Sequence, residues 1–284
     1  GVEVAPPPGL GVPVARRRQN QCRGTVWRIR RRRAYTLDMA RQDDPAAGRR
    51  SKEMHVAQNQ LPAPQMVLHS RMIYTSFLPA DSDACARLLP PALAPAANHA
   101  IYMNQYVVDS AEQTTGFGAY SLTYLGLDVA GHAAPDGVTP GRFFTHYFNS
   151  SKVMREYVRP QGVPATPGRT TLELDGDVLT ATTFVDDRPL IRTRAQVGEV
   201  ALTVSGHLRY ITQVKDRLVS GLYPYIGDLV SPFEVQSIEF LDPEHPVYAL
   251  RPKQPLEVLP AASFYAPKDS FVYPGGVEDL GAAK

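Results

Sequence analysis

Residues 170–185 read TTLELDGDVLTATTFV. Two runs rich in threonine, leucine and valine, TTLEL and VLTATTFV, flank the turn sequence Asp175-Gly176-Asp177. Short runs of this kind on either side of an Asp-Gly turn are typical of a β-hairpin. Asp186-Asp187 then marks a second turn before a further strand-like run at 188–197. The stretch therefore predicts three consecutive antiparallel strands.

Similar runs continue on both sides of this hairpin. They are rich in aromatic and β-branched residues, lie between turn signals, and cover residues 71–78, 100–108, 119–129, 142–148, 199–205, 208–214 and 233–241. Proline-rich connections are expected beyond residue 241. The pattern predicts a mainly β fold with a few short helices, an α+β protein built on an antiparallel barrel or sandwich.

Two short helices are expected between these strands. Asp81 or Ser82 can cap the first, which would run to about Leu89 before two prolines end it. Ser150 or Ser151 can cap the second, around residues 152–157, and Pro160 would stop it.

The N-terminal part of the chain differs in composition from the rest. Residues 1–53 hold 13 Lys and Arg against 5 Asp and Glu, whereas the remainder holds 17 against 23. We expect residues 1–60 to be a disordered, basic, Pro/Arg-rich extension and residues 61–284 to form the domain. The extension could instead be an organellar address, a nucleic-acid or membrane-surface tail, or the product of an over-long gene start.

Composition also narrows the classes of partner and cofactor. The acidic body disfavours nucleic-acid binding, and no apolar run reaches the roughly 18 residues that span a bilayer. With two cysteines and no metal-ligand spacing among the histidines, the sequence indicates no disulfide framework, metal or cofactor. We expect a cytoplasmic protein, without a membrane or nucleic-acid partner, that forms a homo-oligomer.

Five short motifs follow one another within residues 66–215. They are Arg71-Met-Ile-Tyr74, Leu89-Pro-Pro-Ala-Leu93, Thr115-Gly-Phe-Gly-Ala-Tyr120, Arg155-Glu156 with Pro160, and Asp175-Gly-Asp-Val-Leu-Thr-Ala-Thr182. In order and spacing they resemble motifs of the acetoacetate decarboxylase superfamily. The resemblance implies that family's cone-shaped antiparallel β-barrel, which encloses a pocket, for residues 61–284.

The same resemblance indicates where this chain departs from the family. There, a lysine directly after the matched proline forms a Schiff base with the substrate ketone, because a protonated imine accepts electrons better than a carbonyl. Gln161 stands at that position, and Gly162 replaces the neighbouring lysine that lowers the first one's pKa. Two family glutamates fall on Asn104 and Leu122. Schiff-base decarboxylation by the usual route is therefore not expected.

The resemblance also implies candidate site residues. Arg71 matches the arginine that receives a carboxylate, and Asn104 and Gln161 would orient a carbonyl or hydroxyl as catalytic residues. His146 is the candidate acid–base residue. Each has a structural alternative: Arg71 as a strand arginine paired to a surface acid, Asn104 and Gln161 as space-filling residues, and His146 as a hydrogen-bonded core residue.

Further residues are expected around the substrate. Tyr102 and Tyr120 would supply substrate-binding walls, and Arg155 and Glu156 would contact the substrate or form an ion pair that supports the wall. Lys152 could be a relocated amine, although exposure is the commoner fate of a helical lysine. We expect Arg71, Asn104, His146 and Gln161 to converge on one mostly apolar pocket.

Together these features favour an enzyme of secondary metabolism. It would act on a keto acid or polyketide-like substrate as a lyase, dehydratase, cyclase or isomerase, with a small carboxylate or carbonyl compound as its ligand. The alternative is a non-catalytic ligand-binding protein on the same fold.

Overall fold

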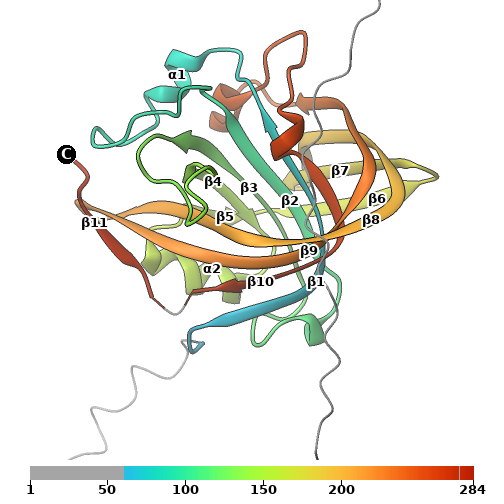
Figure 1. Ribbon diagram of the computed structural model, residues 1–284, viewed down its shortest axis with the longest axis horizontal. Coiled ribbons are helices and arrows are strands. Elements are labelled where there is room, and N and C mark those ends of the chain that lie inside the picture. Colours follow the sequence, from blue (N-terminus) through green and yellow to red (C-terminus); the bar gives the residue numbers. More distant parts are fainter. Residues whose placement is uncertain (1–60, 275) are drawn as a thin grey trace, which may run out of the picture. The chain divides into compact units, whose positions relative to one another are not determined.

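The computed structural model describes residues 61–274 and 276–284, which are mostly β-sheet (Figure 1). Its strands are β1 (Gln65–Phe77), β2 (Ile101–Val108), β3 (Tyr120–Val129), β4 (Gly141–Asn149), β5 (Ala165–Pro167), β6 (Arg169–Asp175), β7 (Val178–Val185), β8 (Arg188–Val214), β9 (Arg217–Phe240), β10 (Phe264–Tyr273) and β11 (Glu278–Ala282). Its helices are α1 (Ser82–Ala86) and α2 (Lys152–Val158), and its 3₁₀ turns are η1 (Ala111–Gln113), η2 (Arg159–Gln161), η3 (Pro246–Leu250) and η4 (Pro260–Ala262). The predicted mainly β fold with a few short helices is confirmed. The disorder predicted for residues 1–60 falls outside the described residues.

The strands close into a barrel. Hydrogen-bonded neighbours follow the order β9, β10, β1, β2, β3, β4 and β8, and β8 then pairs with β9 again. Most pairings are antiparallel, but β4 runs parallel to both β5 and β8. The β4–β8 contact is short, with Arg142 opposite Tyr210 and Phe143 opposite Ile211. The expected antiparallel barrel is therefore present, and a parallel seam closes it.

Strands β8 and β9 are much longer than predicted. The three runs expected at 188–197, 199–205 and 208–214 form one strand of 27 residues, paired with a β9 of 24 residues. A glycine lies in each gap between the expected runs, and each gap therefore looked like the end of a strand. The β8–β9 register shifts near Gly198, so β8 bends there and continues. Its first part pairs with β7 and its last part enters the barrel.

The chain after residue 241 was expected to consist of connections, and this was wrong. It contains β10, which pairs with β1 and β9, and β11, which pairs with β9. The predicted 175–177 turn, in contrast, joins β6 to β7 as an antiparallel hairpin.

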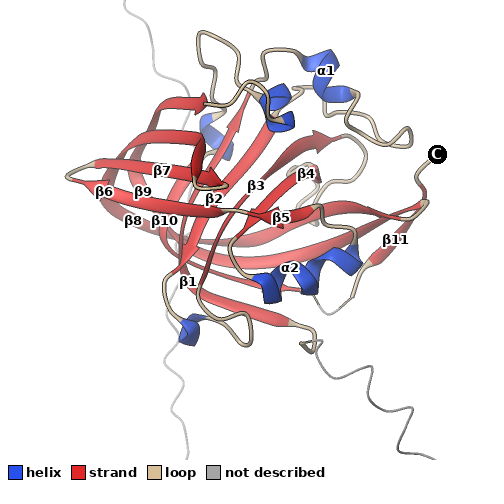
Figure 2. Ribbon diagram, turned by 180° about the vertical axis from the view of Figure 1, so that it is seen from behind, coloured by secondary structure: helices blue, strands red, loops and turns tan. Residues whose placement is uncertain are grey.

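Both predicted helix caps are present. The Asp81 side chain accepts a hydrogen bond from the Ala84 amide at 2.8 Å, and the Ser151 hydroxyl accepts one from the Met154 amide at 3.3 Å. Helix α1 ends at Ala86, earlier than expected. The two helices lie at opposite ends of the barrel in Figure 2. No helix in the described part of the chain has the length and apolar character needed to cross a bilayer.

A buried polar network attaches the β6–β7 hairpin to the barrel. The Thr123 hydroxyl lies 2.7 Å from that of Thr170 and 2.6 Å from that of Thr183, and Gln105 Nε2 donates to Thr183 at 3.0 Å. All four side chains are buried. Because buried hydroxyls need partners, these threonines fix how the hairpin packs on β2 and β3.

Gly126, on the other face of β3, packs closely against the adjacent strand β4. An added Cβ at Gly126 would overlap the backbone carbonyl of Phe143 on the adjacent strand. Gly126→Ala should therefore lower the free energy of unfolding by about 3 kcal/mol, the upper end of the usual range for overpacking. Urea unfolding measures the change. Gly276→Ala, where an added Cβ meets no atom within 4 Å, is the matched control and should have little effect. Equal stability of the two variants would contradict the proposed packing at β3.

Candidate active site

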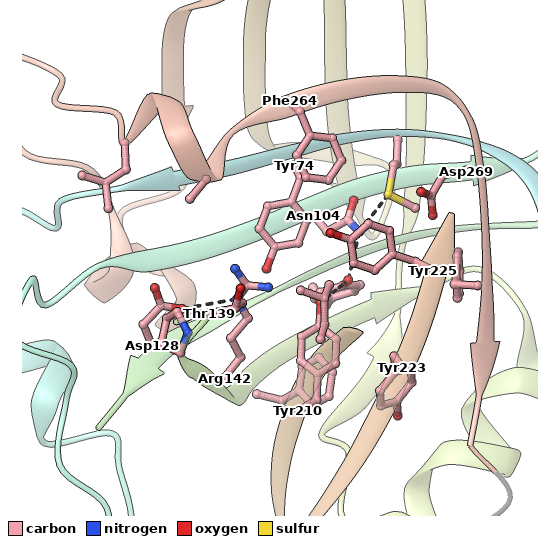
Figure 3. Close-up of a pocket in the computed structure, with 18 of the residues that line it drawn as sticks. Tyr74, Asn104, Asp128, Thr139, Arg142, Tyr210, Tyr223, Tyr225, Phe264 and Asp269 are labelled. Atoms are coloured by element: carbon pink, nitrogen blue, oxygen red, sulfur yellow. Dashed lines mark hydrogen bonds and ion pairs between the residues drawn. The ribbon is translucent and has the colours of Figure 1, made fainter. Parts of the chain in front are cut away.

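The interior of the barrel holds a cavity of about 430 Å³, a size typical of small-molecule pockets. Every strand of the closed circuit contributes inward-facing side chains to it. They include Met72 and Tyr74 of β1, Asn104 of β2, Tyr124 and Asp128 of β3, Arg142, Phe144 and Tyr147 of β4, Tyr210 of β8, Tyr223 and Tyr225 of β9, and Phe264, Asp269 and Tyr273 of β10. The wall is thus mostly aromatic, with a few polar groups (Figure 3).

A buried ion pair lies on one side of this cavity. Arg142 Nε is 3.3 Å from Asp128 Oδ1, and both side chains are almost completely buried. Burial raises the pKa of the Asp128 carboxyl, and the Arg142 charge opposes that shift. Burial lowers the pKa of Arg142, yet the electronegative oxygens around it, Asp128 among them, raise it overall. The guanidinium therefore carries a positive charge inside the barrel.

The guanidinium of Arg142 is held mainly by aromatic rings. Its central carbon lies 4.8 Å from the Tyr74 ring centroid and 5.6 Å from that of Tyr102, which are cation–π distances. An arginine has five N–H donors, and the Nε bond to Asp128 is the only hydrogen bond of Arg142 within residues 61–274 and 276–284. Four donors in a fork geometry are thus without a partner in the described chain. This is the arrangement that a carboxylate fits.

A chain of hydrogen bonds crosses the middle of the cavity wall. Asn104 Nδ2 donates to the Tyr124 hydroxyl at 2.9 Å, and that hydroxyl lies 2.7 Å from the Tyr210 hydroxyl. Because Tyr124 accepts from Asn104, it can donate its own proton to Tyr210. The Tyr210 proton is then free for a ligand. Burial raises the pKa of both tyrosines well above the usual value, so they remain donors.

Asp269 of β10 lies on the opposite side of the site from Arg142 in Figure 3. It lines the cavity and is only 2 % exposed. Burial raises the pKa of this carboxyl to about 8. A carboxyl with that pKa is mostly protonated at neutral pH, so it presents a hydroxyl donor as well as an acceptor.

Of the four residues expected to converge, only Asn104 lines the cavity. Arg71 is on the other face of β1, because Met72 and Tyr74 point inward and strand side chains alternate. Its Nε and Nη2 bind the Asp109 carboxylate at 2.8 and 2.7 Å. The structural alternative for Arg71, a strand arginine paired with an acid, is what the structure contains.

His146 also lies away from the cavity, and a β-bulge explains why. The β3–β4 register shifts between Leu125 and Gly126, which leaves Thr145 as an extra residue. The extra residue shifts the alternation by one, so the inward-facing residue after Phe144 is Tyr147 and not His146. His146 points to the other face. Its ring lies 6.4 Å from that of His245, and burial together with that neighbour lowers its pKa to about 4.

Gln161 is in η2, outside the cavity wall. Its Nε2 donates to the Tyr157 carbonyl at 3.3 Å, and its own carbonyl accepts from the Thr212 hydroxyl at 2.5 Å. The first contact joins the turn to α2, and the second holds it against β8. The predicted convergence of Arg71, His146 and Gln161 with Asn104 on one pocket is therefore wrong.

The remaining candidates do not line the cavity. Tyr102 and Tyr120 are buried on the inner face of the barrel, and the Tyr120 hydroxyl is 2.8 Å from that of Tyr106. Arg155 Nη1 donates to the Asn149 carbonyl at 2.6 Å, and the expected Arg155–Glu156 pair does not form. Glu156 lies 3.7 Å from Lys152 Nζ instead.

No amine of the described chain lines the cavity. The Lys152 side chain is 81 % exposed on α2, so a relocated amine at that position is not supported. Within the same residues, no group of three or more His, Cys, Asp or Glu side chains is placed to hold a metal ion.

Comparison with known proteins agrees with this architecture. No family model and no curated protein matches the sequence. Among solved structures, an acetoacetate decarboxylase superposes with a TM-score of 0.61 at 14 % identity, over 79 % of this chain and 92 % of its own. The chain has the acetoacetate decarboxylase fold. The acetoacetate decarboxylase of Legionella pneumophila gives 0.59 at 13 % identity over 79 % of this chain and 90 % of its own. The enduracididine biosynthesis enzyme MppR, in a complex with pyruvate, gives 0.54 at 17 % identity over 79 % and 93 %.

Sequence reasoning missed three charged residues of this acetoacetate decarboxylase-like barrel. Asp128 and Arg142 lie inside strands among mostly apolar neighbours, in LGLDVA and GRFFTH, whereas Asp269 lies between Lys268 and Ser270 in YAPKDSFV. A charged residue at an inward position of an apolar strand is rarely buried without a role. Asp128 and Arg142 could have been found from this signal, whereas Asp269 lies in a segment predicted to contain no strand.

The raised pKa of Asp269 makes protein stability depend on pH. A folded-state pKa of about 8 exceeds the unfolded value near 4, so the native state binds the extra proton. The stabilising contribution is complete below about pH 4 and is lost as pH rises towards 8, by up to about 1.4 kcal/mol per pH unit. The parent should therefore lose stability relative to Asp269→Asn as the pH rises from 5 to 8, and the difference in unfolding free energy should level off above pH 8. Chemical denaturation across this range measures it, and a constant difference would contradict a protonated Asp269.

Proposed function

We propose that this chain is an enzyme that converts a keto acid or polyketide-like carboxylate inside the barrel without forming a Schiff base. The reaction class is that of a lyase, dehydratase, cyclase or isomerase. The observation that carries the proposal is Arg142, a buried cation with four donors that lack a partner among the described residues and that open on the cavity. Secondary metabolism and a homo-oligomeric state belong to the same proposal.

Arg142 supports an anionic ligand because its charge is only partly compensated. Arg142 forms one long Nε bond with Asp128, at 3.3 Å. A guanidinium can bind a carboxylate more strongly, through two parallel bonds. The aromatic wall around it screens charge poorly compared with water, so attraction to an anion is stronger here than at the surface. A small carboxylate is the ligand that these features favour.

The hydroxyl chain supports a carbonyl or hydroxyl group in the same ligand. Tyr210 has a proton free to donate, because Tyr124 accepts a hydrogen bond from Asn104 and donates its own to Tyr210. A fixed donor near a developing oxyanion stabilises it without reorganisation of solvent. Asn104 remains our candidate catalytic residue, acting through these hydroxyls, and the solved neighbours support the keto-acid class because MppR is described in a complex with pyruvate.

The absence of an amine from the described cavity wall supports chemistry without an imine. The same observation favours a second candidate, a non-catalytic ligand-binding protein that keeps the pocket. The two candidates agree on binding and differ on turnover. A probe that binds but is never converted or exchanged would favour the second.

Binding of pyruvate tests the role of Arg142. Removing the arginine alone would leave Asp128 buried and unpaired, so the test uses the neutral pair Asp128→Asn/Arg142→Gln. We expect this double variant to bind pyruvate more weakly by roughly 10- to 150-fold, equivalent to about 1.5–3 kcal/mol for hydrogen bonds to a charged group. Isothermal titration calorimetry gives the dissociation constants, and circular dichroism checks the fold.

Two control variants make this test specific. Asp128→Asn alone frees Arg142 from its competing carboxylate, so pyruvate should bind as tightly as in the parent or more tightly. Arg71→Ala removes an arginine that lies outside the cavity and should leave binding unchanged. If the double variant binds pyruvate like the parent, Arg142 is not the carboxylate site.

A further inference from the structure

The carboxyl of Asp269 is unpaired within the described barrel. Within the described residues it forms no side-chain hydrogen bond and no ion pair, although its backbone carbonyl accepts a bond from the Ser70 hydroxyl at 3.1 Å. A buried polar group without a partner is unfavourable relative to one that is paired. A buried, unpaired carboxyl that opens on a cavity points to a ligand that supplies the missing partner.

The neighbouring strand leaves room for this carboxyl. Gly227 of β9 lies opposite Asp269 in the β9–β10 register, and an added Cβ at Gly227 would overlap Asp269 Oδ1. Any other residue at position 227 would displace the carboxyl from its present place. The lack of a side chain at Gly227 therefore allows the Asp269 carboxyl to occupy its place in the site.

We propose that Asp269 is a catalytic residue that donates a proton to the carbonyl oxygen of the bound keto acid, an inference that rests on the proposed function above. Figure 3 shows Asn104 between Arg142 and Asp269, so a ligand anchored by its carboxylate at Arg142 extends towards Asp269 along the Asn104 side of the site. Tyr225 faces the same region from β9. The site thus takes a ligand with an anionic end at Arg142 and a carbonyl group on the side of that end facing Asp269, as in a keto acid.

The electrostatic surroundings keep the acid protonated. Burial alone accounts for its raised pKa of about 8, and no charged group contributes to that shift. From β9 the acid faces Tyr225 and Gly227, and from β1 it faces Ser70 and Met72, none of which is charged at neutral pH. An acid with a pKa near the working pH is suited to transfer a proton in either direction.

The step is balanced with water as the only co-reactant. When a C–H bond beside the carbonyl breaks, water takes that proton and the bonding electron pair forms the C=C bond of an enol. The carbonyl π electrons move to oxygen, which takes the proton of Asp269. In the reverse direction the enol carbon takes a proton from solvent and the enol oxygen returns its proton to the Asp269 carboxylate. No oxidant, reductant or cofactor is consumed.

Exchange of the methyl protons of pyruvate for deuterium in D₂O, followed by ¹H NMR, tests this step directly. The parent protein should accelerate exchange over the protein-free rate. Asp269→Asn should reduce the protein-dependent rate by roughly 10²- to 10⁴-fold, the usual contribution of a general acid. Its dissociation constant for pyruvate should stay within about threefold, because an amide still donates a hydrogen bond. Asp228→Asn makes the same chemical change on the neighbouring strand β9, next to Gly227 and off the cavity, and this variant should exchange at the parent rate.

A second measurement needs no variant. In the parent protein labelled with ¹³C-aspartate, one carboxyl resonance should remain that of a protonated acid at pH 7 and should shift when pyruvate is added.

Pyruvate binding to the parent with equal exchange rates in the parent and Asp269→Asn, or with no exchange at all, overturns the role of Asp269 while the carboxylate site stands. Failure of the parent to bind pyruvate overturns the proposed function and this inference together.

Discussion

Strands β4 and β8 meet through two residue pairs, Arg142 with Tyr210 and Phe143 with Ile211, and this short parallel contact turns a row of strands into a closed barrel. Closure gives the sheet an inside that water reaches poorly, and each strand contributes alternate side chains to it. Arg142 and Tyr210 lie at the seam and also line the cavity. The contact that closes the barrel therefore also brings the cation and the hydroxyl chain together from distant parts of the sequence.

An interior lined by tyrosines behaves differently from one lined by aliphatic side chains. Its rings stack on the guanidinium of Arg142, and its hydroxyls bond to one another, as Tyr106 does with Tyr120 and Tyr273 at 2.8 and 2.9 Å. Burial raises the pKa values of Tyr106 and Tyr120 well above the usual value, so they stay neutral donors. Among the described residues that line the cavity, Arg142 is then offset by Asp128, and Asp269 is mostly neutral at pH 7. Such an interior accommodates one ligand charge, and the free donors of Arg142 make a negative one the better fit.

Local sequence signals predicted what local physics determines. The Asp-Gly turn between β6 and β7, both helix caps and most strands of residues 71–197 follow from hydrogen bonds and alternation within a few residues. The long β8 was missed because a bulge near Gly198 bends a strand without ending it, and a glycine reads as a break in either case. The site was mostly misplaced for a related reason. The bulge at Thr145 reverses the inward face of β4, which exchanges His146 for Tyr147, and no pattern in a single strand reveals it. Arg71 is different, since alternation puts it on the face opposite Met72 and Tyr74, and the prediction that it points into the pocket overlooked that these two residues could face inward.

The lack of an amine on the described wall has a consequence for the substrates that the proposed function admits. An imine accepts the electron pair of a breaking bond readily, whereas a plain carbonyl does so only when hydrogen bonds or protonation stabilise the oxyanion. The wall offers neutral donors for that purpose, the Tyr210 hydroxyl and the Asp269 carboxyl, in place of a covalent electron sink. Donors of this strength suffice when a second carbonyl or a carboxylate already activates the neighbouring C–H or C–C bond. The chemistry of the wall thus favours 2-keto acids and β-dicarbonyl compounds over simple ketones, and polyketide-like chains contain that β-dicarbonyl unit.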